Sequence, residues 1–470
     1  SNRSAEDIED GILNIWKVMN KSIYNGMQNS GKLNGNLNIR RRANTLYKKL
    51  IKEDKQFRNH FAYNIKGIRY FKNYINCSIP NKKIETWKFT DLKKVFEKNN
   101  FKPFRKSINA DLTEPTISSQ IPLDISNNIF FNPKINFVIF ENGYLQKFNK
   151  KSDGLEITTL NDITKEKLFN KKNFTRNDSL LDINNTFLNE KLIIRVKKNI
   201  ELKEPISIFY YNSGEEKYLI NNRIIIILEE NAKAEINEIF LSNNQSSYWN
   251  NIHNFIYLKK NSKLNHSKIQ LESKYALHSS SSNVDCDNSS IYNGFIFSAG
   301  GIMSRIEVIS SINSSDINFN IKGLYLAKTN QHHDITTLMQ HKHPHSKSNQ
   351  HIKGILQKES SGVFQGKIIV FQDAQKTDAF QFNQNLLLSE KAEANMKPEL
   401  EIYADDVKCS HGATTGELDE EMLFYLRSRG LNKNKAKKIL IEGFVNELFD
   451  SIENKELKEK LLLTSKKIIH

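Results

Sequence analysis

The middle of the chain consists of short apolar runs separated by polar turns at nearly regular spacing. Four of these turns follow one another at steps of 30, 27 and 25 residues, at Asn231-Ala232, Asn261-Ser262, Asn288-Ser289 and Asn313-Ser314. A unit of this length is too small to bury its own apolar face, so neighbouring units must stack. The repeat constrains the fold to a stacked architecture.

The segments between the turns have the composition of strands. Runs rich in β-branched and aromatic residues, which are typical of strands, begin at Ile135, Lys191, Ile206, Arg223 and Lys367. We therefore predict a mainly β protein whose core, residues 135–416, is a parallel β-helix. A β-sandwich is the alternative, because the spacing does not identify which strands pair.

Helical patterns flank this core on both sides. Residues 1–55 are predicted to form a helical appendage, and residues 56–134 a mostly helical N-terminal region. Residues 417–470 are predicted to form three helices, separated by Gly430 and by a break after Asp450.

Composition excludes several classes of protein. No apolar run approaches the ~18 to 20 residues that a membrane helix needs, so we expect no membrane-spanning segment. Three scattered cysteines, Cys77, Cys286 and Cys409, exclude a disulfide framework and a self-contained four-thiolate cluster site. The first residues lack a secretory signal pattern, and we therefore expect a cytoplasmic location.

The basic excess does not by itself indicate a nucleic-acid partner. Lys plus Arg number 69 against 53 Asp plus Glu, but the basic residues are spread along the whole chain and no DNA- or RNA-reading motif is present. We expect no nucleic-acid partner; a basic nucleic-acid binder is a minor alternative.

Six histidines lie within residues 332–351. On one strand, His341, His343 and His345 would share a face and could ligate a metal ion. Pro344 interrupts the strand pattern, and no carboxylate or thiol lies among the three. The alternative is that they are ordinary strand-edge and loop histidines.

A cysteine and a histidine lie two residues apart in the run DDVKCSHGATTG, residues 405–416. On an extended segment, Cys409 and His411 share a face. A thiolate and an imidazole suit iron, zinc or a sulfur-carrying site. Two ligands are too few for a cluster or a tetrahedral metal, so a second chain or small ligands would have to supply the others.

The region around this pair resembles a known family. Its hallmarks between Gly362 and Leu431 are G-x-F-x-G-K-I-x-V, D-A-Q-K-T-D, N-L-L-L-S, K-P-x-L-E-I-Y-A-D-D-V-x-C-S-H-G-A-T and L-D-E-E-x-L-F-Y-L-x-S-R-G. With PNKKIETWKFTDL near the N-terminus, they make the chain from about Phe57 onward similar to the SufD family of the SUF iron–sulfur cluster assembly system.

The resemblance implies a right-handed parallel β-helix flanked by α-helical N- and C-terminal regions. It implies a scaffold subunit, not an enzyme, that pairs with SufB along the β-helix, binds the ABC-type ATPase SufC and contributes to iron or sulfur delivery. Such a chain holds no cofactor stably alone; a transient iron–sulfur cluster or iron would be shared with SufB. A homodimer is expected when the chain is isolated.

The resemblance also assigns residues. The family's cysteine and histidine fall on Cys409 and His411, which it implies face SufB where clusters are assembled. The ATPase side is expected on the C-terminal helices, at Leu423, Phe424, Leu426, Phe444 and Leu448. A SufB-like cluster scaffold is the alternative, but Asn383 stands near the place of a SufB cysteine and Gly412 stands where SufB has a carboxylate.

The first 55 residues resemble a different protein. The string IWKVMNKSIYNGMQNSGKLNGNLNIRRRANTLYKKL is similar to an internal stretch of bacterial iron–sulfur L-serine dehydratase. The cluster ligands and the catalytic body of that family have no counterpart here. We therefore expect an appended or mis-joined fragment without activity; the alternative is a bifunctional protein in which this segment contributes to serine deamination.

Overall fold

A computed structural model of the chain describes residues 79–99, 101–103, 121–159, 179–214, 217–243 and 245–469. The chain divides into two compact units, one of residues 1–116 and 160–189 and the other of residues 117–159 and 190–470. The described elements of the first unit are η1 (Glu85–Trp87), α5 (Leu92–Asn99), β1 (Lys102–Pro103) and α7 (Ser179–Thr186). The predicted appendage, residues 1–55, lies outside the described residues.

The second unit contains most of the strands. It begins with α6 (Leu123–Ser126), β2 (Asn136–Glu141), β3 (Tyr144–Asn149) and β4 (Leu155–Thr159). The strands that follow are β5 (Glu190–Val196), β6 (Ile206–Asn212), β7 (Tyr218–Leu228), β8 (Lys233–Ser242), β9 (Tyr248–Leu258), β10 (Lys263–Leu271), β11 (Leu277–Cys286), β12 (Ile291–Ser298), β13 (Met303–Ile312), β14 (Asn318–Ala327), β15 (His332–His341), β16 (Lys347–Leu356), β17 (Ser361–Val370), β18 (Asp378–Leu387), β19 (Glu393–Ile402) and β20 (Lys408–Gly416). Three helices end the chain: α8 (Glu420–Ser428), α9 (Lys433–Phe449) and α10 (Lys455–Ile469).

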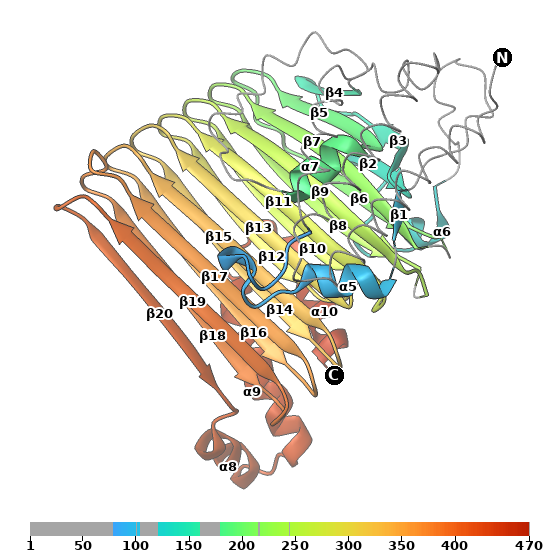
Figure 1. Cartoon of the computed structure of the whole chain (residues 1–470), viewed down its shortest axis with the longest axis vertical. Helices are drawn as coiled ribbons and strands as arrows, with labels where there is room; N and C mark the ends of the chain where they lie inside the picture. Colours follow the sequence, from blue (N-terminus) through green and yellow to red (C-terminus); the bar gives the residue numbers. More distant parts are fainter. Residues whose placement is uncertain are drawn as a thin grey trace, which may run out of the picture. The chain divides into compact units, whose positions relative to one another are not determined.

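These strands form two sheets that face each other along the unit, with the apolar interior between them (Figure 1). The first sheet has the order β19-β17-β15-β13-β11-β9-β7-β5-β4, and the second sheet has the order β20-β18-β16-β14-β12-β10-β8-β6-β2-β3. From β5 onward, successive strands alternate between the sheets and each pairs in parallel with the strand two places along the chain. The predicted parallel β-helix with helices at its ends is therefore confirmed, and the sandwich alternative is excluded.

The predicted start of the core at residue 135 needs a correction. β2 pairs antiparallel with β3, and β4 pairs antiparallel with β5, so these strands form hairpins before the coils begin. Residues 160–189, which the prediction placed in the core, belong to the first unit. The regular coils extend from residue 190 to residue 416.

One corner of each coil is a turn with a residue in the left-handed conformation. The turns predicted at Asn231 and Asn261 are confirmed, with φ values of 60° and 57°. The next left-handed residue, Ser289, lies within the predicted pair Asn288-Ser289, whereas Asp316 lies two residues downstream of the predicted pair Asn313-Ser314. Asn and Asp tolerate this backbone region better than most residues. The repeat seen in the sequence is therefore the spacing of these corners.

The interior between the two sheets is closely packed. Tyr210 stacks between Phe140 and Phe240, with ring centroids 5.3 and 4.5 Å away. Isoleucine, leucine and valine side chains from both sheets, with further aromatic rings, fill the rest of this core. Burying each large apolar side chain contributes about 1.5–3 kcal/mol, so the stacked coils stabilise one another.

The C-terminal helices cover the outer face of the second sheet. Leu448 and Phe449 of α9 and Leu461 of α10 pack against strand residues such as Leu324 and Ile355. The three helices follow the predicted pattern, and their caps are made by short polar side chains. Asp419 accepts hydrogen bonds from the backbone N–H groups of Glu421 and Met422, and Asn432 accepts one from Lys435. Of the helices that the structure describes, none combines the length and the apolarity needed to cross a bilayer.

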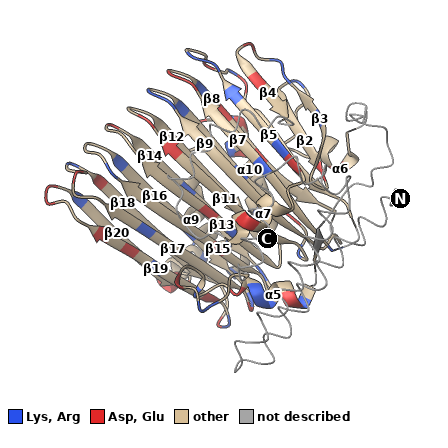
Figure 2. Cartoon of the chain, turned by 45° about the horizontal axis from the view of Figure 1, so that its top comes forward, with Lys and Arg blue, Asp and Glu red and all other residues tan. Residues whose placement is uncertain are grey.

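Charges of both signs are mixed over the coils. In the view of Figure 2, Lys and Arg are interspersed with Asp and Glu along the turns. Several lysines pair with carboxylates of a neighbouring coil, as Lys233 does with Glu201 at 3.0 Å and Lys391 with Glu359 at 3.2 Å. This mixing favours a solvated surface over a basic stripe for nucleic acid.

Candidate functional site

The two sheets end together at the C-terminal coil. In the part of the chain that the structure describes, β19 pairs only with β17, and β20 pairs only with β18. Both terminal strands are therefore edges (Figure 1). An edge strand presents a row of backbone N–H and C=O groups with which another strand can pair.

Cys409 and His411 lie on the inner face of β20. In the parallel register, Cys409 is opposite Ala379 and His411 is opposite Gln381 on β18. Ala379 and Gln381 are buried in the interior, and Cys409 packs against the same core. Because strands in register point their side chains the same way, both candidate residues face the open end of the interior.

The thiol and the imidazole differ in environment. Cys409 is half-buried, and His411 is exposed. Burial raises the pKa of the Cys409 thiol above its ordinary value; a hydrogen bond with the Ala379 backbone opposes this, and the nearby Asp378 adds to it. The thiol is therefore protonated at neutral pH, and it becomes a strong ligand only when a metal ion or a base takes its proton.

Gln381 of β18 is the residue directly opposite His411 of β20. Its side-chain Nε2 donates to the Gly366 carbonyl at 3.3 Å, while its Oε1 is buried without a hydrogen-bond partner among the described residues. A buried acceptor of this kind is costly to leave unpaired. Its partner in register on β20 is His411, whose ring N–H groups are suitable donors. Sequence reasoning missed Gln381, because its position opposite His411 depends on the pairing of two strands.

The opposite edge, β19, is also part of the open end. Thr415 of β20 donates a hydrogen bond to the sulfur of Met396 on β19 at 3.4 Å, which brings the two terminal strands together across the interior. Pro398 lies in the middle of β19. Proline within a sheet is confined largely to edge strands, so this residue was the signal by which the sequence could have identified the edge.

The three histidines proposed as metal ligands are not brought together. β15 ends at His341, whose side chain is buried and contacts Ser348 Oγ at 2.8 Å. His343 and His345 are exposed in the turn that follows, and His345 is its left-handed residue, with φ of 62°. The regular strand that would have given them a common face is absent because the corner of the coil lies there. Over the described ranges, no group of three or more His, Cys, Asp or Glu residues is arranged to hold a metal ion.

The five residues expected on the ATPase side fall into three groups by exposure. Leu423 and Leu448 are buried, Leu448 within the core beneath α9. Phe424 is 73% exposed on α8, and Leu426 and Phe444 are partly buried. Met422 and Tyr425, which the sequence analysis did not single out, are also exposed beside Phe424 on α8. The exposed apolar side chains of this region are therefore most concentrated on α8, while α9 and α10 each expose one, Ile439 and Leu463.

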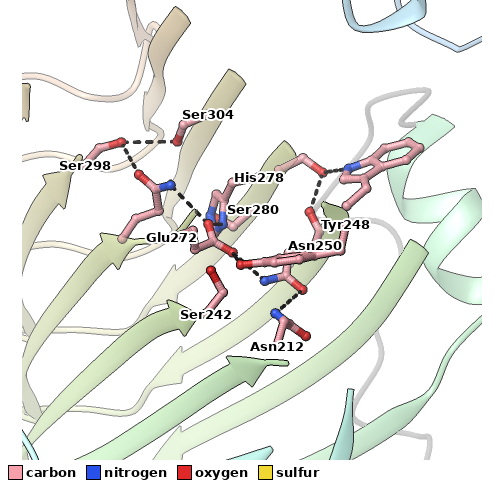
Figure 3. A network of polar contacts seen from close by, with 12 residues as sticks. Asn212, Ser242, Tyr248, Asn250, Glu272, His278, Ser280, Ser298 and Ser304 are labelled. Atoms are coloured by element: carbon pink, nitrogen blue, oxygen red, sulfur yellow. Dashed lines mark hydrogen bonds and ion pairs between the residues drawn. The ribbon is translucent and has the colours of Figure 1, made fainter. Parts of the chain in front are cut away.

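A polar network is buried where β10 turns into β11 (Figure 3). Glu272 accepts hydrogen bonds from Tyr248 at 2.9 Å, from Asn250 at 2.7 Å and from Gln270 at 3.1 Å. It also lies 2.8 Å from His278 Nδ1. Burial alone would raise the pKa of Glu272, but His278 and these hydrogen bonds hold it below its ordinary value. Both carboxylate oxygens are thus used within the fold.

A second buried carboxylate lies deeper in the interior. Glu238 accepts hydrogen bonds from Tyr210 at 3.0 Å and Asn254 at 2.5 Å, and it contacts His266 at 2.8 Å. Lys268 lies 3.2 Å away. Although burial opposes ionisation, Lys268 and His266 hold the pKa of Glu238 at about 2. A buried pair of this kind is costly to break, because removing either partner leaves an uncompensated charge.

We expect acid to destabilise the fold partly through His333. This histidine is fully buried beside Ser298, and burial, with a smaller effect of His332, lowers its pKa from 6.5 to about 3. Below the unfolded value of 6.5 the unfolded chain binds a proton that the folded chain does not, so stability falls as the pH drops from 6.5 towards 3. His333→Gln should therefore lose less stability than the parent when urea unfolding is compared at about pH 7 and about pH 4.5. Equal losses in the two proteins would contradict this role.

Comparison with known proteins places these elements in a family context. Residues 209–444 match the family described as SUF system FeS cluster assembly, SufBD core domain. The match begins within β6 and ends within α9, so it includes most of the coils, both edge strands and the pair Cys409 and His411.

Individual relatives, matched over longer stretches of the chain, agree with this assignment. The chain is 30% identical over 404 residues to an iron-sulfur cluster assembly SufBD family protein of Synechocystis, covering 82% of this chain and 86% of that protein. It is 28% identical over 401 residues to the iron-sulfur cluster assembly protein SufD of Escherichia coli, covering 84% and 90%. A chloroplastic protein of Arabidopsis thaliana, ABCI7, is 31% identical over 296 residues, covering 61% and 62%.

Proposed function

Because the chain belongs to the SufBD family of the SUF iron–sulfur cluster assembly system, we propose that it is the SufD-type scaffold subunit of an assembly complex. In this proposal it is not an enzyme by itself. It pairs with a SufB-type subunit through the open C-terminal coil and binds a SufC-type ATPase through its C-terminal helices. Membership of the family supports the role in cluster assembly. The two partner subunits are the part that we propose.

One observation carries the proposal: a thiol and an imidazole lie on the inner face of the last strand, at the open end of a solenoid. A β-helix whose last coil has two free edges can continue into a second β-helix by strand pairing. Cys409 and His411 would then lie between the two subunits, on the inner face of the shared sheet. A second copy of the chain could use the same edges when no SufB-type subunit is present.

The donor set fits a shared site better than a self-contained one. A cluster normally takes four protein ligands, and this end of the chain offers one thiol and one imidazole. The partner would supply the other ligands for the iron of the cluster, and the iron and sulfide are handled as cargo. His411 is exposed and can bind iron or accept a proton through a ring nitrogen. Cys409 is half-buried and protonated, so it would act after losing its proton to the incoming group.

Asn383 and Gly412 support the SufD branch over a SufB-like scaffold. Asn383 is buried; its Nδ2 donates to the Ile352 carbonyl at 3.0 Å, and its Oδ1 accepts from Asn385 at 2.7 Å. It therefore makes the bonds of a structural amide and offers no thiol. Gly412 supplies no carboxylate next to His411.

The ATPase would bind the apolar surface of α8. We expect Phe424→Ser to weaken copurification of a SufC-type ATPase by about tenfold or more, because large exposed aromatics often dominate an interface. Leu463→Ser on α10 is the matched control, since Leu463 is also an exposed apolar residue, at 48%. Equal retention of the ATPase by both variants would exclude α8 as the binding surface.

Coexpression is the direct test of the proposed function. The chain is produced with SufB-type and SufC-type subunits, one of which carries an affinity tag, and the purified complex is loaded with iron and sulfide. We expect all three chains to copurify and to assemble a cluster. Failure of this chain to copurify with either subunit would refute the proposal. The bifunctional alternative for residues 1–55 is tested by an assay of pyruvate release from serine, and we expect no release.

A further inference from the structure

Helix α9 is joined to the second sheet by a buried lysine. Lys353 of β16 has a side chain only 2% exposed, and its Nζ lies 2.5 Å from Glu447 of α9. The same Nζ donates to the backbone carbonyl of Phe444 at 2.9 Å and lies 4.6 Å from the centre of the Phe444 ring. One cation thus contacts the helix through a carboxylate, a carbonyl and an aromatic face.

Beside this contact, one row of side chains crosses the sheet to its edge. The outer row consists of Lys322 on β14, His351 on β16, Phe382 on β18 and Gly412 on β20, which are successive partners in register. Directly opposite residues on neighbouring strands are the closest side-chain pairs in a sheet. The row therefore runs from beneath α9 to the residue that follows His411.

Phe382 is the member of the outer row that contacts its neighbours on both sides. His351 lies 5.4 Å from the Phe382 ring, measured between ring centres, and its Nε2 contacts Gln384 at 3.1 Å. The hydrogen bond from Lys353 lowers the pKa of Glu447 against the opposing effect of burial, and His351 and Lys322 lower it further. At the edge, a Cβ added to Gly412 would lie 2.8 Å from Phe382 Cδ2. Phe382 therefore packs closely against the β20 backbone.

We propose that α9 positions strand β20, and with it His411, through Lys353 and the outer row. Among the described strands, β20 pairs in the sheet only with β18, so its position follows mainly the position of β18 and of Phe382. A movement of α9 would be transmitted by Lys353 and His351 to Phe382 and then to the backbone at Gly412. The purpose of this link, which is to couple the ATPase to the cluster site, rests on the proposed function; the link itself is a property of this chain.

Hydrogen exchange in the full chain tests the link without any partner. Lys353→Met keeps the length of the side chain and removes its charge. We expect the amides of β20 to exchange about fivefold faster or more, together with those of α9. The matched control is Lys263→Met, because Lys263 of β10 pairs at 2.7 Å with Glu453, which follows α9, but four strands separate β10 from β20 in the same sheet. This control should leave exchange in β20 unchanged.

Two further variants separate the steps of the link. Phe382→Leu should accelerate exchange in β20 and leave α9 unchanged, because the contact with Gly412 lies beyond the helix. Glu447→Gln removes an exposed charge, and it should reproduce part of the effect of Lys353→Met if that protein fails to fold. Faster exchange in α9 with unchanged β20 in Lys353→Met, or no effect of Phe382→Leu on β20, would overturn the proposal. These outcomes do not depend on cluster yield, so they are distinguishable from a failure of the proposed function.

Discussion

Replacing His411 by alanine should abolish most cluster formation while the three-subunit complex still assembles. His411 is exposed on β20 and makes few packing contacts, so the fold and the edge should survive its removal. The loss should be at least as large as the about 10- to 100-fold losses that follow when groups that merely orient a ligand are removed. The measurement is the yield of cluster, from its absorbance and its iron and sulfide content, in the copurified complex.

The matched control for this experiment is His343→Ala. His343 is also an exposed histidine, but it lies in a corner turn and not at the open end. We expect the control to assemble clusters like the parent. If His411→Ala gives the parental yield, the imidazole has no role in assembly, and the cluster site must be sought elsewhere.

Ala413→Pro should prevent pairing with the SufB-type subunit without unfolding the chain. The Lys408 N–H donates to Thr377 at 2.8 Å, which points the even-numbered residues of β20 towards β18. Since backbone groups alternate in direction along a strand, the N–H of Ala413 points to the free edge. Proline removes that donor and adds bulk to the edge.

The expected loss of affinity is large. A buried carbonyl of the partner strand left without its donor costs about 1–3 kcal/mol, which corresponds to binding about tenfold weaker or more. Copurification and analytical ultracentrifugation measure it, and Ala413→Ser, which keeps the N–H, is the control. The thermal midpoint of the isolated chain should stay close to that of the parent. Undiminished pairing of Ala413→Pro would mean that the subunits meet through another surface.

Much of the fold could be predicted from the sequence because the repeat is local. Asn231 and Asn261 mark corners of coils, since few other residues adopt their backbone conformation easily. The apolar runs between the corners became strands, and the polar residues Asp419 and Asn432 became helix caps. Each of these signals acts within a few residues of itself and needs no knowledge of the partner strand.

The features that depend on pairing could not be predicted. The position of Gln381 behind His411 and of Phe382 against Gly412 follows from the register of β18 with β20, which no spacing in the sequence reveals. The histidines at 343 and 345 were misleading for a local reason: their corner carries no Asn or Gly, and Pro344 was the only sign that the strand ends there. The buried Glu238 lies among apolar strand residues and gave a signal only as an isolated charge.

The unpaired edges of β19 and β20 expose the isolated protein to unwanted strand pairing in the cell. The N–H and C=O groups of an edge strand can pair with an extended segment of a wrong chain as readily as with that of the right one. Copies made in excess of the companion, the proposed SufB-type subunit, would be prone to aggregation and to degradation by proteases. The proposed pairing therefore predicts that the chain accumulates best when it is made in fixed proportion with its companion or joins it soon after translation.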